Sequence, residues 1–278
     1  MGPAVSDWMN GERNMSRLNG KIIIVTGSTQ GVGAAIASHC AEQGAAGLVI
    51  CGRNEENGKA VAGAIDQCPV EFVRADFEHV ADCRQVVRRC DERFGRVDGL
   101  VNAAAVTTRG TLDETSVELW DQLFAVNARA PFFVTQEAVR IMRRERIPGS
   151  IVNILSITKY CGPDFLCAYS STKGAMATFT KNVANHLLAD RIRVNGINLG
   201  WTDTPNEHVA QVKMGQPENW LEHAERVSPF GRLIKPIDVA RLTVFLLSDD
   251  AGVMTGALID HGQRVIGAMT TPRADEDE

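Results

Sequence analysis

A tyrosine and a lysine four residues apart are the pair in this sequence with the clearest chemical use. Tyr169 and Lys173 enclose the segment Tyr-Ser-Ser-Thr-Lys, inside a stretch, 168–188, that predicts a helix. A spacing of four residues places both side chains on one helix face. A phenol with its ordinary pKa of about 10 exchanges protons poorly at neutral pH, but a nearby ammonium favours the phenolate. The pair therefore predicts a phenol that accepts a proton during alcohol oxidation and returns it during carbonyl reduction.

A glycine-rich turn near the N-terminus predicts a binding site for a dinucleotide. It joins a predicted strand, 21–26, to a predicted helix, 32–43, with the spacing G-x-x-x-G-x-G rather than the common G-x-G-x-x-G. Glycines there let the backbone turn sharply and approach a pyrophosphate, whose charge then lies at the helix N-terminus. The alternative is a purely structural turn. The turn contains Thr26, Gly27, Ser28, Thr29, Gln30, Gly31, Val32 and Gly33.

The end of the second predicted strand, 47–51, favours one nicotinamide cofactor over the other. An acid at this place would bind the ribose 2′-hydroxyl of NAD and repel a 2′-phosphate. The chain instead continues with Gly52, Arg53 and Asn54. Arg53 could hold the 2′-phosphate of NADP with two hydrogen bonds, or it could simply face solvent. We therefore expect NADP(H) to be preferred, with NAD(H) possible.

The elements that position these residues alternate along the chain. This alternation predicts an α/β fold, a single-domain, Rossmann-type doubly wound parallel sheet of about seven strands flanked by helices. Pro131 predicts a bend at 127–131 within the long helix, and residues 205–230 are mixed and polar. Short apolar runs predict strands at 21–26, 47–51, 70–74, 98–102, 150–155, 192–197 and 257–260. Longer patterns predict helices at 32–43, 55–67, 79–94, 116–144, 168–188 and 236–247.

Charge and hydropathy exclude several classes of protein. The 278 residues include 29 basic and 34 acidic side chains, a net charge of −5, and residues 269–278 alone hold four acids and one arginine. A protein that binds nucleic acid through phosphates normally has a basic surplus, so no nucleic-acid partner is expected. No apolar run approaches the roughly 18 residues of a membrane span, so no membrane partner is expected either. We expect a flexible leader at 1–17, a catalytic domain at 18–268 and a flexible acidic tail at 269–278.

The cysteines indicate a reducing compartment. There are seven, an odd number, without a C-x-x-C pair, and the six histidines lack metal-ligand spacing. Buried small hydrophobic thiols are the simplest interpretation. A cytoplasmic protein without a metal site is therefore expected.

Together these motifs resemble the short-chain dehydrogenase/reductase family, from about residue 21 to residue 262. The resemblance implies that Ser156, thirteen residues before the tyrosine, orients the substrate oxygen, and that Asn127 completes a proton relay through water to the lysine. The implied catalytic set is Asn127, Ser156, Tyr169 and Lys173. The implied cofactor-binding set is Gly27, Thr29, Gln30, Gly31, Val32, Gly33, Arg53, Asn54, Asp76, Phe77, Asn102, Ala103, Ala104, Tyr169, Lys173, Gly200, Thr202 and Thr204.

The chain departs from the family pattern in two turns. The usual Asn-Asn-Ala-Gly after the fourth strand is Asn102-Ala103-Ala104-Ala105, and the usual Pro-Gly before the nicotinamide loop is Leu199-Gly200. The added methyl groups are expected to crowd the first turn. The family also forms homo-oligomers, so a tetramer or dimer through the predicted helices 116–144 and 168–188 is expected.

The substrate is expected to be a small polar alcohol or carbonyl compound, a sugar, a polyol or a hydroxy or keto acid. In this fold it lies outside the carboxyl ends of the strands, where segments 106–110, 157–167 and 201–228 should line it. The alternatives are reduction of a 3-oxoacyl-type substrate, epimerisation or dehydration, and a redox-inactive nucleotide-binding regulatory module. The last segment is polar, with Thr202, Glu207, His208, Gln211, Asn219, Trp220, Glu222 and His223.

Overall fold

Seven parallel strands form one sheet at the centre of the molecule. The computed structural model describes residues 16–268, so the expected acidic tail and all but the last two residues of the expected leader lie outside the described residues. The strand order is β3-β2-β1-β4-β5-β6-β7, and every neighbouring pair is parallel. This arrangement confirms the predicted doubly wound sheet. The strands are β1 Ile22–Thr26, β2 Gly47–Gly52, β3 Val70–Arg74, β4 Gly99–Asn102, β5 Ser150–Ser156, β6 Arg193–Leu199 and β7 Leu258–His261.

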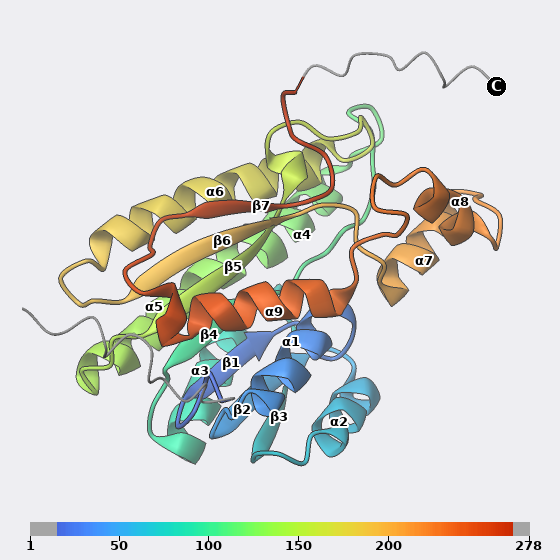
Figure 1. Ribbon diagram of the computed structural model, residues 1–278. Helices are drawn as coiled ribbons and strands as arrows, with labels where there is room; N and C mark the ends of the chain where they lie inside the picture. Colours follow the sequence, from blue (N-terminus) through green and yellow to red (C-terminus); the bar gives the residue numbers. More distant parts are fainter. Residues whose placement is uncertain (1–15, 269–278) are drawn as a thin grey trace, which may run out of the picture.

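Helices cover both faces of the sheet (Figure 1). One face packs against α1, α2 and α9 and the other against α3, α5 and α6, which gives two separate apolar cores. All positions of β1 and β2 are buried, because strands covered on both faces need apolar side chains on both. The helices are α1 Gly31–Glu42, α2 Glu55–Ala64, α3 Val80–Phe94, α4 Val117–Phe124, α5 Ala130–Arg144, α6 Cys167–His186, α7 Pro205–Lys213, α8 Trp220–Arg226 and α9 Pro236–Leu247.

The strand order reverses direction at the junction of β1 and β4. Successive strands step outward from β1 to β3, and then the chain returns to place β4 on the other side of β1. At such a switch point the loops after the two strands diverge and leave a crevice at the carboxyl edge of the sheet. The glycine-rich turn after β1 and the alanine-rich loop after β4 therefore lie at the same edge.

The long helix predicted at 116–144 is interrupted at the place where a bend was expected. Helix α4 ends at Phe124, a single π-helical turn covers Ala125–Arg129, and α5 begins at Ala130. Pro131 has no N–H to donate to the carbonyl of Asn127, four residues earlier. The main-chain carbonyl oxygen of Asn127 therefore lacks the N–H donor, four residues later, that it would have in a regular α-helix.

The polar segment at 205–230 contains two short helices that the sequence pattern did not predict. Thr204 caps α7 by accepting a hydrogen bond from the backbone N–H of Glu207, and Pro205 occupies the first helical position. Helix α8 buries Trp220 against Ala224 and Leu233 in a small separate cluster. Both helices project beyond the carboxyl ends of the strands (Figure 1). Helix α2 is also shorter than predicted, because it ends at Ala64 rather than at residue 67.

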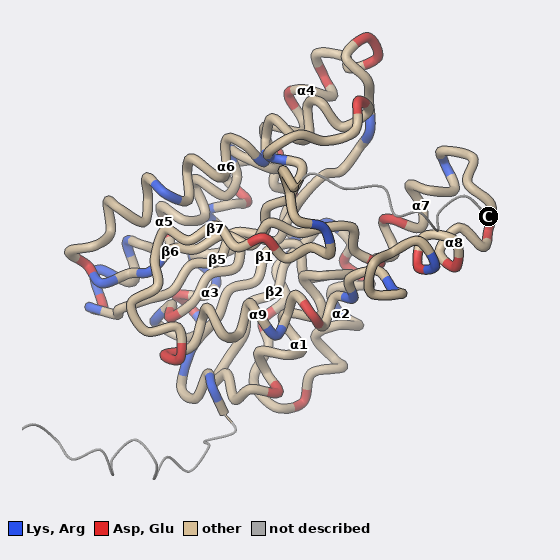
Figure 2. The backbone as a smooth tube through the Cα atoms, turned by 45° about the horizontal axis from the view of Figure 1, so that its top comes forward, with Lys and Arg blue, Asp and Glu red and all other residues tan. Residues whose placement is uncertain are grey.

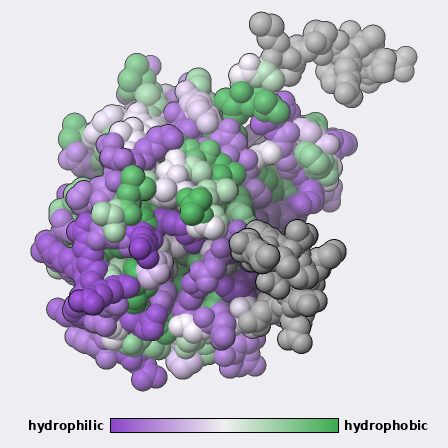
Figure 3. Space-filling model, turned by 60° about the vertical axis from the view of Figure 1, so that its left-hand side comes forward, coloured by the Kyte–Doolittle hydropathy of each residue, from purple (hydrophilic) through white to green (hydrophobic). Residues whose placement is uncertain are grey.

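Charged and apolar side chains are mixed over the surface. Basic and acidic residues are interspersed over the described backbone (Figure 2), and hydrophobic patches lie among hydrophilic ones on the face shown in Figure 3. No helix within residues 16–268 is long and apolar enough to cross a membrane. Most cysteines are buried or partly buried as expected, but Cys161 and Cys167 are exposed, which corrects the prediction that all of them pack in the interior.

Candidate active site

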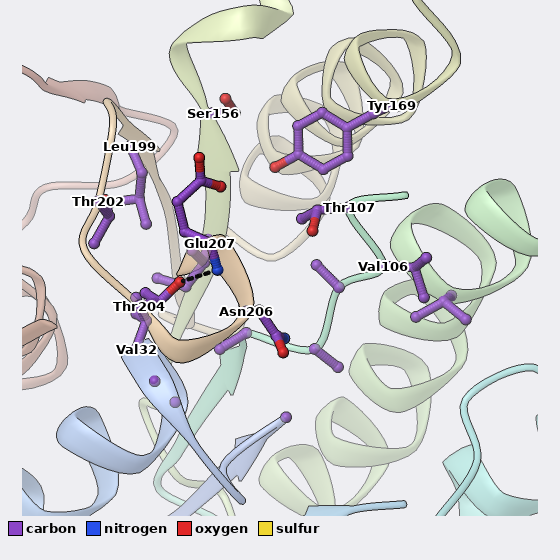
Figure 4. A pocket seen from close by; sticks show the side chains of 18 of the residues that line it. Val32, Val106, Thr107, Ser156, Tyr169, Leu199, Thr202, Thr204, Asn206 and Glu207 are labelled. Carbon is purple, nitrogen blue, oxygen red and sulfur yellow. Dashed lines mark hydrogen bonds between the residues drawn. The ribbon is translucent and has the colours of Figure 1, made fainter. Parts of the chain in front are cut away.

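A cavity of about 820 Å³ lies at the carboxyl edge of the sheet. Segments that follow β1, β2, β3, β4, β5 and β6 bound it. All of the expected cofactor residues except Asn102 line this cavity, and so do Ser156, Tyr169 and Lys173. Figure 4 shows side chains from separate loops facing one space, with Val32 on one side and Tyr169 on the other. The fold thus brings together residues that are more than a hundred positions apart in the chain.

The glycine-rich turn has no room for a Cβ at Gly27 or Gly33. Gly27 and Gly31 have positive φ angles of 65° and 56°, which favour glycine. A Cβ added to Gly27 would lie 2.5 Å from the Cα of Ala104, and one added to Gly33 would lie 2.2 Å from the carbonyl oxygen of Gly27. Helix α1 begins here, and within the described chain the side chain of Gln30 forms no capping hydrogen bond to it. Free N–H groups at this helix start fit the pyrophosphate of a dinucleotide.

The alanines after β4 are fixed by the threonine that ends β1. The backbone N–H groups of Ala103 and Ala104 both donate to Oγ1 of Thr26, at 3.0 and 3.1 Å, and that hydroxyl donates to the carbonyl of Val101. Their methyl groups line the cavity beside Gly27. At these two positions the alanines are no larger than the asparagine and alanine of the family pattern, so they do not crowd this wall, and the turn stays anchored by Thr26.

The end of β2 presents one cation to the cavity. The side chain of Arg53 is 60% exposed, and its Nη1 lies 4.0 Å from Oε1 of Glu78. Asn54 is occupied elsewhere, because its side chain accepts a hydrogen bond from Asn57 as the N-cap of α2. The carboxylate of Asp76 accepts from the N–H of Glu78 and so shapes the turn after β3. Arg53 is thus the group here that could bind a phosphate. Glu78 would compete with that phosphate for the guanidinium, and the sequence pattern did not single out this glutamate.

Tyr169 and Lys173 lie on one face of α6, as their spacing predicts. The Nζ of Lys173 is 5.5 Å from the centre of the Tyr169 ring and donates a hydrogen bond of 2.9 Å to the carbonyl of Ile154. Burial lowers the pKa of Lys173 to about 8. Burial also raises the pKa of Tyr169 to about 12, against a smaller lowering by the Ser156 hydroxyl, and the charge of Glu207 raises it further. The phenol is therefore protonated at neutral pH in the protein alone.

Ser156 ends β5 with a hydroxyl whose proton is available. Its Oγ accepts hydrogen bonds from the backbone N–H and the Oγ1 of Thr158, at 3.1 and 2.9 Å. Because both contacts use the oxygen as acceptor, the Ser156 hydroxyl keeps its own proton to donate. It can donate that proton to a substrate oxygen placed next to Tyr169.

Asn127 and Asn102 lie behind the cavity wall rather than on it. Asn127 is buried, and its side chain accepts from the N–H of Val106, donates to the carbonyl of Val106 and donates to Oγ1 of Thr172. These bonds fasten the loop after β4 to the helix that carries Lys173. The Asn102 amide donates to Thr135 and Asn153, so it joins β4 to α5 and β5.

The substrate end of the cavity contains Glu207 and Gln211, which the sequence placed in the expected polar segment, and Arg109, which lies in the expected segment 106–110 but was not singled out. Arg109 comes from the loop after β4, and Glu207 and Gln211 come from α7. His208 instead pairs with Asp203, and Trp220 is buried in its own cluster. A single arginine in a loop forms no local sequence pattern, so the pairing of Arg109 with Glu207 across the cavity could not be predicted. Asn219, Trp220, Glu222 and His223 were expected near the substrate but do not line the cavity.

Comparisons with known proteins identify the class of protein. A family model described as enoyl-(acyl carrier protein) reductase matches residues 27–262. The chain is 34% identical over 251 residues to an NADP-dependent (R)-specific alcohol dehydrogenase of Lentilactobacillus kefiri, covering 88% of this chain and 97% of that one. It is 32% identical to a 3-oxoacyl-[acyl-carrier-protein] reductase of Thermotoga maritima, covering 87% and 96%. The chain belongs to the short-chain dehydrogenase/reductase family.

Solved structures agree with this assignment. An actinorhodin polyketide ketoreductase variant with NADPH superimposes with a TM-score of 0.83 at 26% identity, covering 88% of this chain and 96% of that one. A short-chain dehydrogenase/reductase from Serratia marcescens superimposes with a TM-score of 0.78 at 30% identity, covering 88% and 97%. The protein is therefore an oxidoreductase of this family, with a Rossmann-like fold that binds a nicotinamide cofactor.

Proposed function

We propose that this protein is an NADP(H)-preferring oxidoreductase that interconverts a secondary alcohol and a ketone on a small polar substrate. The observation that carries the proposal is the convergence of Ser156, Tyr169 and Lys173 on one cavity with the glycine-rich turn. A nicotinamide cofactor held along that turn supplies the hydride for reduction, or accepts it in oxidation. The side chains of this protein supply the proton and hold the oxygen.

Each of the four expected catalytic residues has a distinct role in this proposal. The Ser156 hydroxyl donates a hydrogen bond to the carbonyl oxygen and orients it. The Tyr169 phenol donates its proton to that oxygen as the hydride reaches the carbon, or takes the proton back from the alcohol in oxidation. The Lys173 ammonium stabilises the phenolate that forms. The main-chain carbonyl of Asn127, without its helical partner, is the natural acceptor for a water that returns a proton to Lys173.

The preference for NADP(H) rests on Arg53. It follows β2 at a position where an acid would select NAD(H), and its exposed guanidinium can form two hydrogen bonds to a phosphate. The relative from Lentilactobacillus kefiri is named as NADP-dependent, and the polyketide ketoreductase was solved with NADPH. NAD(H) remains a possible second cofactor because Glu78 partly neutralises this arginine.

Reduction of a 3-oxoacyl substrate is the second candidate. The relative from Thermotoga maritima carries that activity in its name. Such a substrate would present its carbonyl to the same Ser156 and Tyr169, so the substrate end of the cavity decides between the two candidates. The cavity also suits a redox-inactive nucleotide-binding regulator, which would bind the cofactor without turnover.

The proposal includes a homo-oligomer in the cytoplasm. Large apolar side chains on the helices around the π-helical turn are exposed, among them Trp120 and Phe132. A contact with another copy of the chain would cover them. The seven cysteines are free thiols, which is consistent with a reducing compartment.

A substrate panel with both cofactors tests the proposal. Purified protein is mixed with NADPH or NADH and ketones, keto acids and 3-oxoacyl thioesters, and with NADP or NAD and polyols, sugars and hydroxy acids, while nicotinamide absorbance is followed. We expect turnover with NADP(H), and we expect Tyr169→Phe to lower kcat by about 10²–10⁴-fold because the proton donor is lost. The matched control is Tyr160→Phe, since Tyr160 is exposed and lies outside this cavity, where its hydroxyl donates to Asp260 of β7.

Two outcomes would contradict the proposal. One is cofactor binding, followed by fluorescence, without any change of absorbance across the panel, which is the behaviour of a regulatory module. The other is full activity of Tyr169→Phe. Product formation with catalytic amounts of cofactor and no net absorbance change would instead indicate epimerisation or dehydration.

A further inference from the structure

Glu207 places a carboxylate inside the substrate end of the cavity. It is the third residue of α7, fixed by the bond from its N–H to the Thr204 hydroxyl that Figure 4 draws as a dashed line. The side chain is 18% exposed and lines the cavity. Figure 4 shows the carboxylate directed away from Thr204, toward the side where Ser156 and the Tyr169 hydroxyl lie. A charge in this place acts directly on whatever binds beside the reacting groups.

One oxygen of this carboxylate is fully occupied and the other is open. Oε1 accepts hydrogen bonds from Arg109, Trp201 and Gln211, at 2.9, 2.9 and 2.7 Å. Oε2 accepts no hydrogen bond from the described residues. Three donors on one oxygen fix the orientation of the group, so Oε2 is left as a preorganised acceptor on a side chain that lines the cavity.

The other charges at this end of the cavity are already used. The Arg109 guanidinium bonds Glu207 and lies 5.3 Å over the ring of Phe165, and the Lys173 ammonium donates to Ile154. The charge of Glu207 also acts on the Tyr169 phenol, which shows that the two groups are within electrostatic range. The salt bridge to Glu207 occupies the Arg109 guanidinium, so an anionic substrate finds no free cation in that arginine, whereas a hydroxyl donor finds Oε2 open.

We infer that Glu207 determines substrate specificity by accepting a hydrogen bond from a second hydroxyl on a neutral substrate. The substrate class is then a diol or the corresponding hydroxyketone, rather than a keto acid or a simple ketone. This inference rests on the proposed function and sharpens it, because hydroxy and keto acids leave the list of favoured substrates. A carboxylate acceptor suits a hydroxyl donor because charge-assisted hydrogen bonds are stronger than neutral ones.

Matched ketones test this inference. The first set keeps an ethyl ketone and varies the neighbouring group: 1-hydroxy-2-butanone, 3-pentanone and 2-oxobutanoate. The second set does the same on a phenyl ketone: 2-hydroxyacetophenone, propiophenone and phenylglyoxylate. We expect kcat/KM of the wild-type protein with NADPH to be at least about tenfold higher for the hydroxyketone than for either companion, in at least one set.

Glu207→Gln supplies the decisive comparison. The three donors will hold the amide oxygen in the place of Oε1, so the amide NH₂ replaces Oε2 and an acceptor becomes a donor. We expect kcat/KM for the hydroxyketone to fall about tenfold, mostly through KM, while the simple ketone changes less than about threefold and the keto acid improves. Glu222→Gln is the matched control, because Glu222 is exposed on α8 and lies outside the cavity.

The outcomes separate the two proposals. A wild-type protein that reduces the ketones without favouring the hydroxyketone overturns the inference and leaves the proposed function intact, and this comparison needs no variant. A Glu207→Gln protein that keeps the wild-type preference also overturns it. Failure of the wild type to reduce any ketone of either set or of the wider panel overturns the proposed function, and the inference with it.

Discussion

Lys173 is a lysine whose amino group is buried, an environment that disfavours its charged form. Its Nζ is buried with one carbonyl partner, and burial lowers its pKa from 10.5 to about 8. Lys173 is therefore still an ammonium at pH 7, but in the folded state it loses its proton near pH 8, whereas in the unfolded chain it keeps the proton up to its ordinary pKa. Below pH 8 the cost of the buried charge is complete, about 3 kcal/mol from the size of the shift. It disappears as pH rises from 8 toward 10.5, so this residue makes stability increase with pH in that window.

Lys173→Met is accordingly expected to stabilise the cofactor-free protein at pH 7. The variant removes the buried charge and loses the bond to Ile154, so we expect a net gain of about 1–3 kcal/mol in the free energy of unfolding, with activity abolished. Urea denaturation at pH 7 and at pH 10 measures both effects. The gain must shrink at pH 10, and an equal difference at the two pH values would contradict the assigned cause.

Arg53 is the residue on which cofactor choice depends. We expect Arg53→Gln to lower kcat/KM for NADPH by about 10–100-fold, because charge-assisted hydrogen bonds to the 2′-phosphate are lost. The kcat/KM for NADH should change by less than about threefold. Steady-state kinetics with both cofactors measure this. Lys59→Gln is the matched control, since Lys59 is an exposed cation on α2 paired with Glu55. Equal losses for both cofactors would show that Arg53 does not read the phosphate.

At the scale of elements, the turn between β1 and α1 depends on close backbone contacts. Gly33 is buried in the first turn of α1, where a Cβ would lie 2.2 Å from the carbonyl of Gly27. Backbone cannot move aside as a flexible side chain can. The turn must therefore shift to admit any larger residue, and the helix N-terminus shifts with it.

Gly33→Ala is expected to weaken cofactor binding at least tenfold and to lower the free energy of unfolding by about 1–3 kcal/mol, the usual cost of overpacking. Isothermal calorimetry with NADP and urea denaturation measure the two effects. Gly63→Ala makes the same change in α2 where a Cβ meets nothing within 4 Å, so it should be neutral or slightly stabilising. Wild-type affinity in Gly33→Ala would show that the close approach is not needed.

The π-helical turn between α4 and α5 shows how one element serves two purposes. It turns the buried Asn127 side chain toward Val106 and Thr172, and it begins α5 with Pro131 in the first turn. The sequence predicted a bend here from the proline alone. The direction of the asparagine could not be predicted, because it depends on a loop and a helix that the local pattern does not contain.

Across the whole molecule, exposed aromatic side chains are the basis of the proposed self-association. Phe132 on α5 is 45% exposed and packs on Phe179 of α6, with ring centres 5.7 Å apart. Covering such a surface against a second copy would remove apolar area from water.

Phe132→Glu is therefore expected to reduce the sedimenting species from a tetramer or dimer toward the monomer. A charge placed in an apolar contact must lose its hydration, which weakens association. Sedimentation velocity measures the change. Val212→Glu is the matched control, because Val212 is exposed on α7, away from these helices. A wild-type monomer, or an unchanged Phe132→Glu oligomer, would contradict the predicted interface.

Local patterns in the sequence predict the order of the strands and of the helices that flank the sheet, the parallel sheet and the two motifs that identify the family. These follow from local patterns: continuous apolar runs such as β1, helical periodicity, a glycine turn after a strand, and a tyrosine and lysine one helical turn apart. The helices α7 and α8 escaped prediction because they are short, polar and interrupted by prolines.

The charges and open acceptor at the substrate end of the cavity depend on the folding of distant loops onto one another. Arg109 and Glu207 are 98 positions apart, and neither stands in a recognisable pattern, yet they meet across the cavity. Packing likewise buries Lys173, and it places Asn127 and Asn102 behind the cavity wall rather than on it. The physical reason is the same in each case. Periodicity and spacing act over a few residues, whereas charge pairing, desolvation and the shape of a cavity depend on which distant loops the folded sheet brings to one edge.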